Sequence, residues 1–120
     1  MIPHLIGGER VDSREHFITY NPATGEALDE VASGGDMEVA AAVEAAKSAF
    51  PAWAGTPAKT RASIMRKVGD LIQKLSPELA ALETEDTVLP IDQTSHALIP
   101  RAADNFYFFA EVATRMDGKC

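Results

Sequence analysis

The 120-residue sequence predicts an α/β fold, of the α+β kind within the residues given, in which N-terminal β-hairpins precede about five helices. Three observations predict it. Short runs of β-forming residues flank turn sequences up to about residue 33. Apolar residues then recur at spacings of three and four, as on one face of a helix. Thr-Pro and Ser-Pro pairs mark places where helices begin.

The first 33 residues predict two antiparallel strand pairs. His4-Leu5-Ile6 and Arg10-Val11 lie on either side of a Gly7-Gly8 turn. Residues 17–20 and 27–31 flank residues 21–26, where Pro22 fixes φ and Gly25 supplies a positive φ. Because isolated hairpins are marginally stable, we expect another element to cover one of their faces.

The first helix is expected to begin after Gly34-Gly35-Asp36 and to end at Pro51. Its apolar stripe consists of Val39, Ala42, Val43, Ala46, Ala49 and Phe50. Most of these side chains are small, so we expect this face to pack closely against a neighbouring backbone. Trp53 is interpreted as a packing anchor.

The sequence delimits three of the further helices. Thr56-Pro57 predicts an N-cap and a first helical residue, before an apolar stripe of Ile64, Met65, Val68, Leu71, Ile72 and Leu75. Ser76-Pro77 predicts the start of a short helix that continues towards Glu83. Pro90 and Pro100 are expected to interrupt the chain. The last helix should run from about Arg101 to Asp117, bury Phe106, Phe109, Ala110, Ala113 and Met116, and be followed by Gly118.

Composition excludes several classes of function. The net charge of −7 argues against nucleic acid and against anionic membrane surfaces as partners. No apolar segment reaches the length of a membrane span, and a single Cys fits a reducing compartment, so a cytoplasmic protein is expected. Residues 1–120 should form a single partial domain, with hairpins in 1–33 and helices in 34–120.

Five motifs follow one another at intervals that resemble those of a known family. They are Ile6-Gly7-Gly8-Glu9-Arg10-Val11, Asn21-Pro22-Ala23-Thr24-Gly25-Glu26, Ala45-Ala46-Lys47-Ser48-Ala49-Phe50-Pro51-Ala52-Trp53, Glu83-Thr84-Glu85-Asp86 and Asn105-Phe106-Tyr107-Phe108-Phe109-Ala110-Glu111. Together they resemble the amino-terminal quarter of the aldehyde dehydrogenase superfamily, from about Leu5 to Lys119. The stretch from Leu98 to Phe106 is most similar to the enzymes that oxidise hydroxymuconic and 5-carboxymethyl-2-hydroxymuconic semialdehydes.

The resemblance implies an amino-terminal piece, from the cofactor-domain region, of an NAD(P)-dependent enzyme that oxidises a carboxylated semialdehyde and forms homo-oligomers. The family's catalytic Cys, its general-base Glu and its Gly-rich cofactor loop lie beyond these residues. The complete enzyme would use NAD or NADP, whereas the 120-residue chain alone should bind no cofactor, contain no catalytic residue and be inactive. The alternative is a stand-alone, non-catalytic helical module that binds a partner or oligomerises.

Arg101 is the candidate substrate-binding residue. In the first turn of the expected helix, the macrodipole disfavours a cation by about 0.3 to 1 kcal/mol, so a pairing anion is expected. The resemblance implies that this Arg holds a substrate carboxylate, a bidentate task that suits a guanidinium. The alternative is a structural ion pair with Asp104 or another carboxylate.

The resemblance also implies a monovalent-cation site, formed by Asp86 and backbone oxygen of Thr19-Tyr20. Alternatively, Asp86 caps a turn and Glu83 and Glu85 are solvated. Val88 stands where the family usually has Gly. A left-handed backbone at that position would add about 1 to 2 kcal/mol of strain, unless the loop takes another path.

The remaining candidates for chemistry have simpler interpretations. His4, His16 and His96 lack metal-ligand spacing and are interpreted as surface or capping residues. A nucleophilic Cys needs a structured pocket and a group that lowers its pKa, and the family's catalytic Cys belongs to a later segment with a different local sequence, so Cys120 is interpreted as a bystander.

Overall fold

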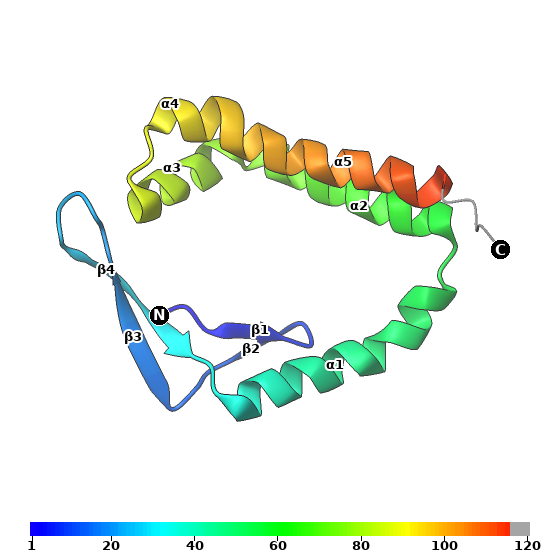
Figure 1. Ribbon diagram of the computed structural model, residues 1–120, viewed down its shortest axis with the longest axis horizontal. Coiled ribbons are helices and arrows are strands. Elements are labelled where there is room, and N and C mark those ends of the chain that lie inside the picture. Colours follow the sequence, from blue (N-terminus) through cyan, green and yellow to red (C-terminus); the bar gives the residue numbers. More distant parts are fainter. Residues whose placement is uncertain (116–120) are drawn as a thin grey trace. The chain divides into compact units, whose positions relative to one another are not determined.

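The structure, a computed structural model, describes residues 1–115. The chain forms two compact units, the first from Met1 to Gly55 and the second beginning at Thr56 (Figure 1). Four strands and one long helix make up the first unit, and the second is helical. The predicted mixture of N-terminal β-hairpins and following helices is confirmed.

Both predicted hairpins are present. Strand β1 (His4–Ile6) pairs antiparallel with β2 (Glu9–Val11), and β3 (Glu15–Tyr20) pairs antiparallel with β4 (Ala27–Ser33). The turn between β3 and β4 closes as its sequence predicts, because Gly25 has φ +73° and its N–H donates to the Asn21 carbonyl at 2.8 Å. Within the described residues of this unit, Ala32 is the one buried apolar side chain.

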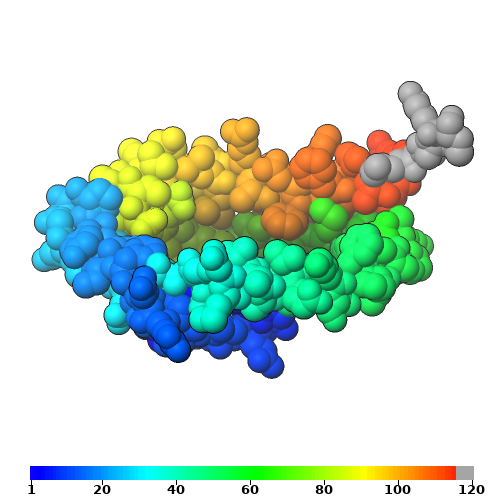
Figure 2. Space-filling view, turned by 60° about the horizontal axis from the view of Figure 1, so that its bottom comes forward, coloured from blue at the N-terminus to red at the C-terminus, as the bar shows by residue number. Residues whose placement is uncertain are grey.

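Helix α1 (Asp36–Gly55) starts where predicted but does not end at Pro51, which lies inside it. Pro51 has no N–H to donate to the Lys47 carbonyl, and this part of the helix is exposed, so water can reach that carbonyl. No residue of α1 is buried, and Trp53 is 45% exposed. The close packing expected for this face is therefore not found, and α1 forms the cyan-to-green ridge of Figure 2.

In the second unit, helix α2 (Ala58–Lys74) packs along α5 (Ile99–Arg115) (Figure 1). The buried residues of this contact are small: Ala62 and Gly69 on α2, and Ala103 and Ala110 on α5. Each pair is separated by seven residues, so each lies on one face of its helix. Small side chains allow the two backbones to approach closely.

Several of the larger apolar residues are exposed, which corrects the predicted burial of Phe106 and Phe109, whereas Ala110 is buried as predicted. On α2, Ile64 and Leu71 are 42% and 53% exposed. On α5, Phe106 and Phe109 are 37% and 55% exposed, although the sequence predicted their burial. Tyr107 faces α2 instead, with its ring against Gly69. The helix-start prediction is also displaced by one residue, because Pro57 occupies the N-cap position assigned to Thr56.

Helix α3 (Ser76–Thr87) begins at the predicted Ser-Pro pair. It ends at Val88, which has φ +62° and donates its N–H to the Thr84 carbonyl at 2.9 Å. The backbone at this position is therefore left-handed, and the loop does not take another path. Val88 is the one non-glycine residue with positive φ in the described chain.

The last helical run is longer than predicted. It begins after Pro90 with α4 (Ile91–Gln93), continues through a π-helical turn, η1 (Thr94–Leu98), and passes without a break into α5. Pro100 therefore does not interrupt the chain, and Arg101 does not lie in the first turn of a helix. The predictions for Met116, Asp117, Gly118 and Cys120 fall outside the described residues.

Candidate functional site

Arg101 lies about three turns into the final helical run, because the run begins at Ile91. The prediction that Arg101 lies at the N-terminal, positive end of a helix dipole is therefore wrong. Its side chain is exposed, and within residues 1–115 the structure records neither an ion pair nor a hydrogen bond for its guanidinium. The expected structural pairing with Asp104 is not formed.

An apolar hollow of about 150 Å³ lies beside the same face of α5. It is lined by Met65 from α2 and by Asn105, Phe106 and Phe109 from α5. Asn105 follows Arg101 by four residues and Phe109 by eight, so these three side chains are neighbours on one helix face. Arg101 does not line the hollow itself but lies one helical turn before Asn105, which does. A cation with no recorded partner within residues 1–115, one turn from an apolar hollow, suits a ligand that has both a carboxylate and a carbon skeleton.

The proposed cation-site residues are placed separately. Tyr20 is the exposed last residue of β3, next to a register shift between Thr19 and Tyr20 in the first unit. Asp86 is exposed in the last turn of α3 in the second unit. The two residues belong to different compact units, and joint cation binding by them stays a prediction.

Capping of the α3 end, the alternative role of Asp86, belongs to Thr87. Thr87 Oγ1 donates to the Glu83 carbonyl at 2.6 Å and accepts the Leu89 N–H at 3.3 Å. The Asp86 side chain has no recorded hydrogen bond within residues 1–115.

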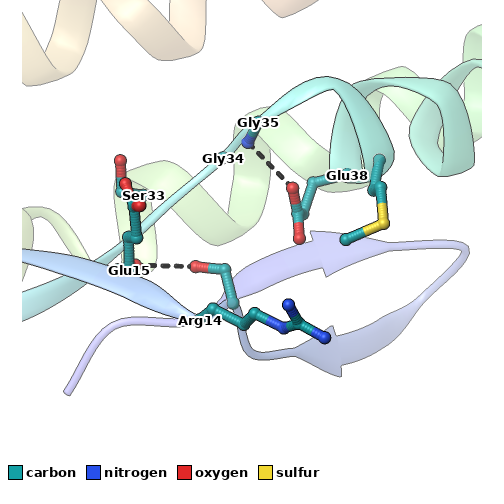
Figure 3. Close-up of a pocket in the computed structure, with 8 residues that line it drawn as sticks. Arg14, Glu15, Ser33, Gly34, Gly35 and Glu38 are labelled. Carbon is teal, nitrogen blue, oxygen red and sulfur yellow. Dashed lines mark hydrogen bonds between the residues drawn. The ribbon is translucent and has the colours of Figure 1, made fainter.

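Gly34-Gly35 precede a helix at the start of α1, a position where a phosphate-bearing cofactor can bind in other proteins. A pocket of about 220 Å³ lies beside it, lined in part by Arg14, Ser33 and Glu38 (Figure 3). However, Glu38 Oε2 already accepts the Gly35 N–H at 2.8 Å, and this bond lowers the pKa of the Glu38 carboxyl. A carboxylate that occupies the helix N-terminus repels a phosphate, so these residues do not fit a dinucleotide.

Two of the three histidines, His16 and His96, pair with a nearby carboxylate, as suits the surface or capping role predicted for them. His16 Nε2 lies 2.7 Å from Asp12 Oδ1, and this bond holds the pKa of the Asp12 carboxyl below its ordinary value. His96 Nδ1 lies 3.1 Å from Asp92 Oδ1. In the part of the chain that the structure describes, no group of three His, Cys, Asp or Glu residues could hold a metal ion. Within that part, too, no helix has the length and apolar character needed to cross a membrane.

Two residues near the site were missed by sequence reasoning. Thr94 is fully buried within the π-helical turn, and its hydroxyl lies 2.9 Å from Thr84 Oγ1. Tyr107 is half-buried against Gly69 and donates its O–H to Asp70 Oδ1 at 2.8 Å. The only hint of Tyr107 in the sequence is that it lies four residues after Ala103 and three before Ala110, on the small-residue face.

Comparison with known proteins finds that the chain is similar to members of one family. The model described as "Aldehyde dehydrogenase family" matches residues 10–120. The chain is 56% identical over 118 residues to 5-carboxymethyl-2-hydroxymuconate semialdehyde dehydrogenase of Escherichia coli, covering 98% of the chain and 25% of that protein. It is 34% identical over 120 residues to 2-aminomuconic semialdehyde dehydrogenase of Bos taurus, covering 100% of the chain and 25% of the relative.

The chain also resembles solved structures in its backbone. PnpE in complex with nicotinamide adenine dinucleotide superposes with a TM-score of 0.96 at 32% identity, over 98% of this chain and 25% of that one. HpcC from Thermus thermophilus gives a TM-score of 0.92 at 38% identity, over 98% of this chain and 23% of that one. The chain thus spans about a quarter of the length of the relatives it matches.

Proposed function

Because this chain belongs to the aldehyde dehydrogenase family, we propose that it is the amino-terminal segment of an enzyme that oxidises a carboxylated semialdehyde to the acid. The names of both curated relatives described above specify muconic semialdehydes, which carry a carboxylate at a distance from the aldehyde. Such a substrate needs a cationic group away from the reacting carbon.

Arg101 supplies that group, and its free guanidinium is the observation that carries the proposal. A structural Arg on a surface with more acidic than basic residues would be expected to pair with a carboxylate, yet none is recorded for Arg101 within residues 1–115. Two parallel N–H groups of a guanidinium match the two oxygens of a carboxylate. The hollow beside Asn105 and Phe109 then receives part of the unsaturated carbon chain.

The reacting groups belong to the rest of the enzyme. The complete protein would use NAD or NADP as hydride acceptor, and no described residue is assigned to hold it. The nucleophilic Cys and the general-base Glu also lie outside this segment, in a cytoplasmic homo-oligomer. The segment contributes substrate recognition rather than chemistry.

The test is a comparison of substrates in the complete enzyme that carries this segment. Arg101→Ala should lower kcat/KM for 5-carboxymethyl-2-hydroxymuconate semialdehyde by about 10- to 100-fold, which corresponds to about 1.5 to 3 kcal/mol for a charged hydrogen bond. The same change should leave kcat/KM for hexanal nearly unaltered. Arg101→Lys should recover only part of the loss, because an ammonium lacks the bidentate geometry. Equal losses on both aldehydes would show that Arg101 is structural.

A second candidate, a binding or oligomerisation module, is favoured by one observation. No residue of α1 is buried, and its apolar residues Met37, Val39, Val43 and Phe50 are 49% to 69% exposed. Such a surface is typical of one that is covered by a partner.

A further inference from the structure

The π-helical turn η1 is the feature that the proposed recognition of a carboxylate leaves unexplained. π-helical turns are rare and occur frequently at functional sites. Here Ile99 donates its N–H to the Thr94 carbonyl, five residues back, so the turn contains one residue more than an α-helical turn. Pro100 follows at once. It has no N–H, and in a regular α-helix its ring would collide with the carbonyl of His96, which the wider turn avoids.

The extra residue changes which way Arg101 faces. Each α-helical residue turns the chain by about 100°, so in an unbroken α-helix Arg101 would lie within about 20° of Thr94. Thr94 is fully buried, and Arg101 would be turned towards the protein with it. With one residue absorbed by the π-helical turn, the angle becomes about 120°. Arg101 is accordingly exposed.

The same rotation brings the two buried faces of the helical run closer together around the helix axis. Thr94 is buried beside α3, and Ala103 is buried against α2. In an unbroken α-helix these two residues would lie on opposite faces, about 180° apart, whereas the wider turn brings them to about 80°. The run can therefore pack against both helices, and Arg101 is left on the free side.

Thr94 fixes the turn through its hydroxyl. Thr94 Oγ1 donates to the Ile91 carbonyl at 3.0 Å, and a hydroxyl has one proton, so Thr84 must donate to Thr94 across their 2.9 Å contact. One bond ties Thr94 to the start of its own run, and the other ties the run to α3. Thr94 is completely enclosed, so it cannot touch a ligand itself.

We infer that Thr94 and Thr84 are positioning residues for substrate recognition: the hydrogen bond between their hydroxyls holds the π-helical turn, and that turn directs Arg101 towards the substrate carboxylate. The inference rests on the proposed function, since it assigns these residues a role through Arg101. It predicts that removing a buried hydroxyl alters discrimination between aldehydes, and not only stability.

The experiment measures one ratio in the complete enzyme that carries this segment: kcat/KM for 5-carboxymethyl-2-hydroxymuconate semialdehyde divided by kcat/KM for hexanal. Thr94→Val keeps the shape of the side chain but removes its hydroxyl, and should lower the ratio about tenfold, mainly through KM for the carboxylated substrate. Thr94→Ser keeps the hydroxyl and should retain the ratio. Thr84→Val removes only the bond between helices, and it serves as a second variant if Thr94→Val fails to fold.

Two controls separate positioning from general damage. Thr114, on the exposed part of α5, donates its hydroxyl to the Glu111 carbonyl at 2.8 Å, and Thr114→Val should leave the ratio unchanged. In an Arg101→Ala background, Thr94→Val should lower the ratio no further, because its effect passes through Arg101.

The outcomes are distinct. If Arg101→Ala lowers the ratio but both Thr→Val changes leave it unaltered, the positioning role is overturned and the proposed function stands. If Arg101→Ala itself leaves the ratio unaltered, the proposed function and the positioning role are both refuted. A further fall in the double variant would also overturn the inference.

Discussion

Gly69→Ala tests the close contact between α2 and α5. A Cβ built on Gly69 would lie 2.7 Å from Tyr107 Cε1 and 2.9 Å from Tyr107 Cζ. Carbon atoms in contact are ordinarily about 3.5 to 4.0 Å apart, so the ring must move by close to 1 Å. Such overpacking costs about 1 to 3 kcal/mol. Ala is a better helix former than Gly by about 1 kcal/mol, which offsets part of that cost.

The collision should outweigh the gain in helix propensity. Movement of the ring also withdraws the Tyr107 hydroxyl from Asp70, whose bond is 2.8 Å long in the native structure. We therefore expect Gly69→Ala to lower the free energy of unfolding of the 120-residue chain by about 1 to 2 kcal/mol. Urea titration followed by far-ultraviolet circular dichroism measures the change.

A change of sign provides the internal control. In a Tyr107→Ala background the obstructing ring is absent, so Gly69→Ala should stabilise the chain by about 1 kcal/mol. Gly55→Ala is a second comparison, because a Cβ there would meet no atom within 4 Å. If Gly69→Ala is neutral or stabilising while Tyr107 is present, α2 and α5 do not pack as closely as described.

Three further predictions concern Val88, Tyr107 and the surface of α1. Val88→Gly should raise the free energy of unfolding by about 0.5 to 1 kcal/mol, because relief of the left-handed strain exceeds the entropy cost of Gly, whereas Val88→Ala should give no such gain. The Asp70 hydrogen bond raises the pKa of Tyr107 above the ordinary 10.0, so its stabilising contribution is complete below pH 10.0 and is lost as the pH rises through the folded-state pKa. In a Tyr20→Phe background, phenolate absorbance should show a lower Tyr107 pKa after Asp70→Asn, and an unchanged pKa would contradict the bond. The 120-residue chain should self-associate in sedimentation equilibrium through Val39, Ala42, Val43 and Ala46, and Val43→Glu should weaken this; a wild-type monomer at high micromolar concentration would refute it.

Local signals predicted much of the backbone. The turn at Asn21–Gly25 and the start of α3 at Ser76 depend on residues within a few positions of each other, and both form as their sequences indicate. Position 88 is a similar case: the resemblance to a family that has Gly there raised the question of a left-handed residue, and Val88 adopts that conformation.

Errors arose where the outcome depends on contacts between distant segments. Pro100 is a local stop signal, but the π-helical turn before it removes the collision, and that turn is tied to α3 by Thr94. The same error placed Arg101 in a first helical turn. On α5, the sequence predicted burial of Phe106, Phe109 and Ala110, but of these three only Ala110 is buried, together with Ala103, because small residues make the close contact with α2.

The two units differ in how much of their stability they supply themselves. The second unit buries small residues between α2 and α5 and has a hydrogen bond between two hydroxyls that joins α3 to η1, so its helices are fixed by their own contacts. In the described first unit, Ala32 is the one buried apolar residue, and no residue of α1 is buried. A binding residue is most precise when a rigid element carries it. Arg101 meets that condition, since it lies on α5 between the Thr94 anchor and the Ala103 contact.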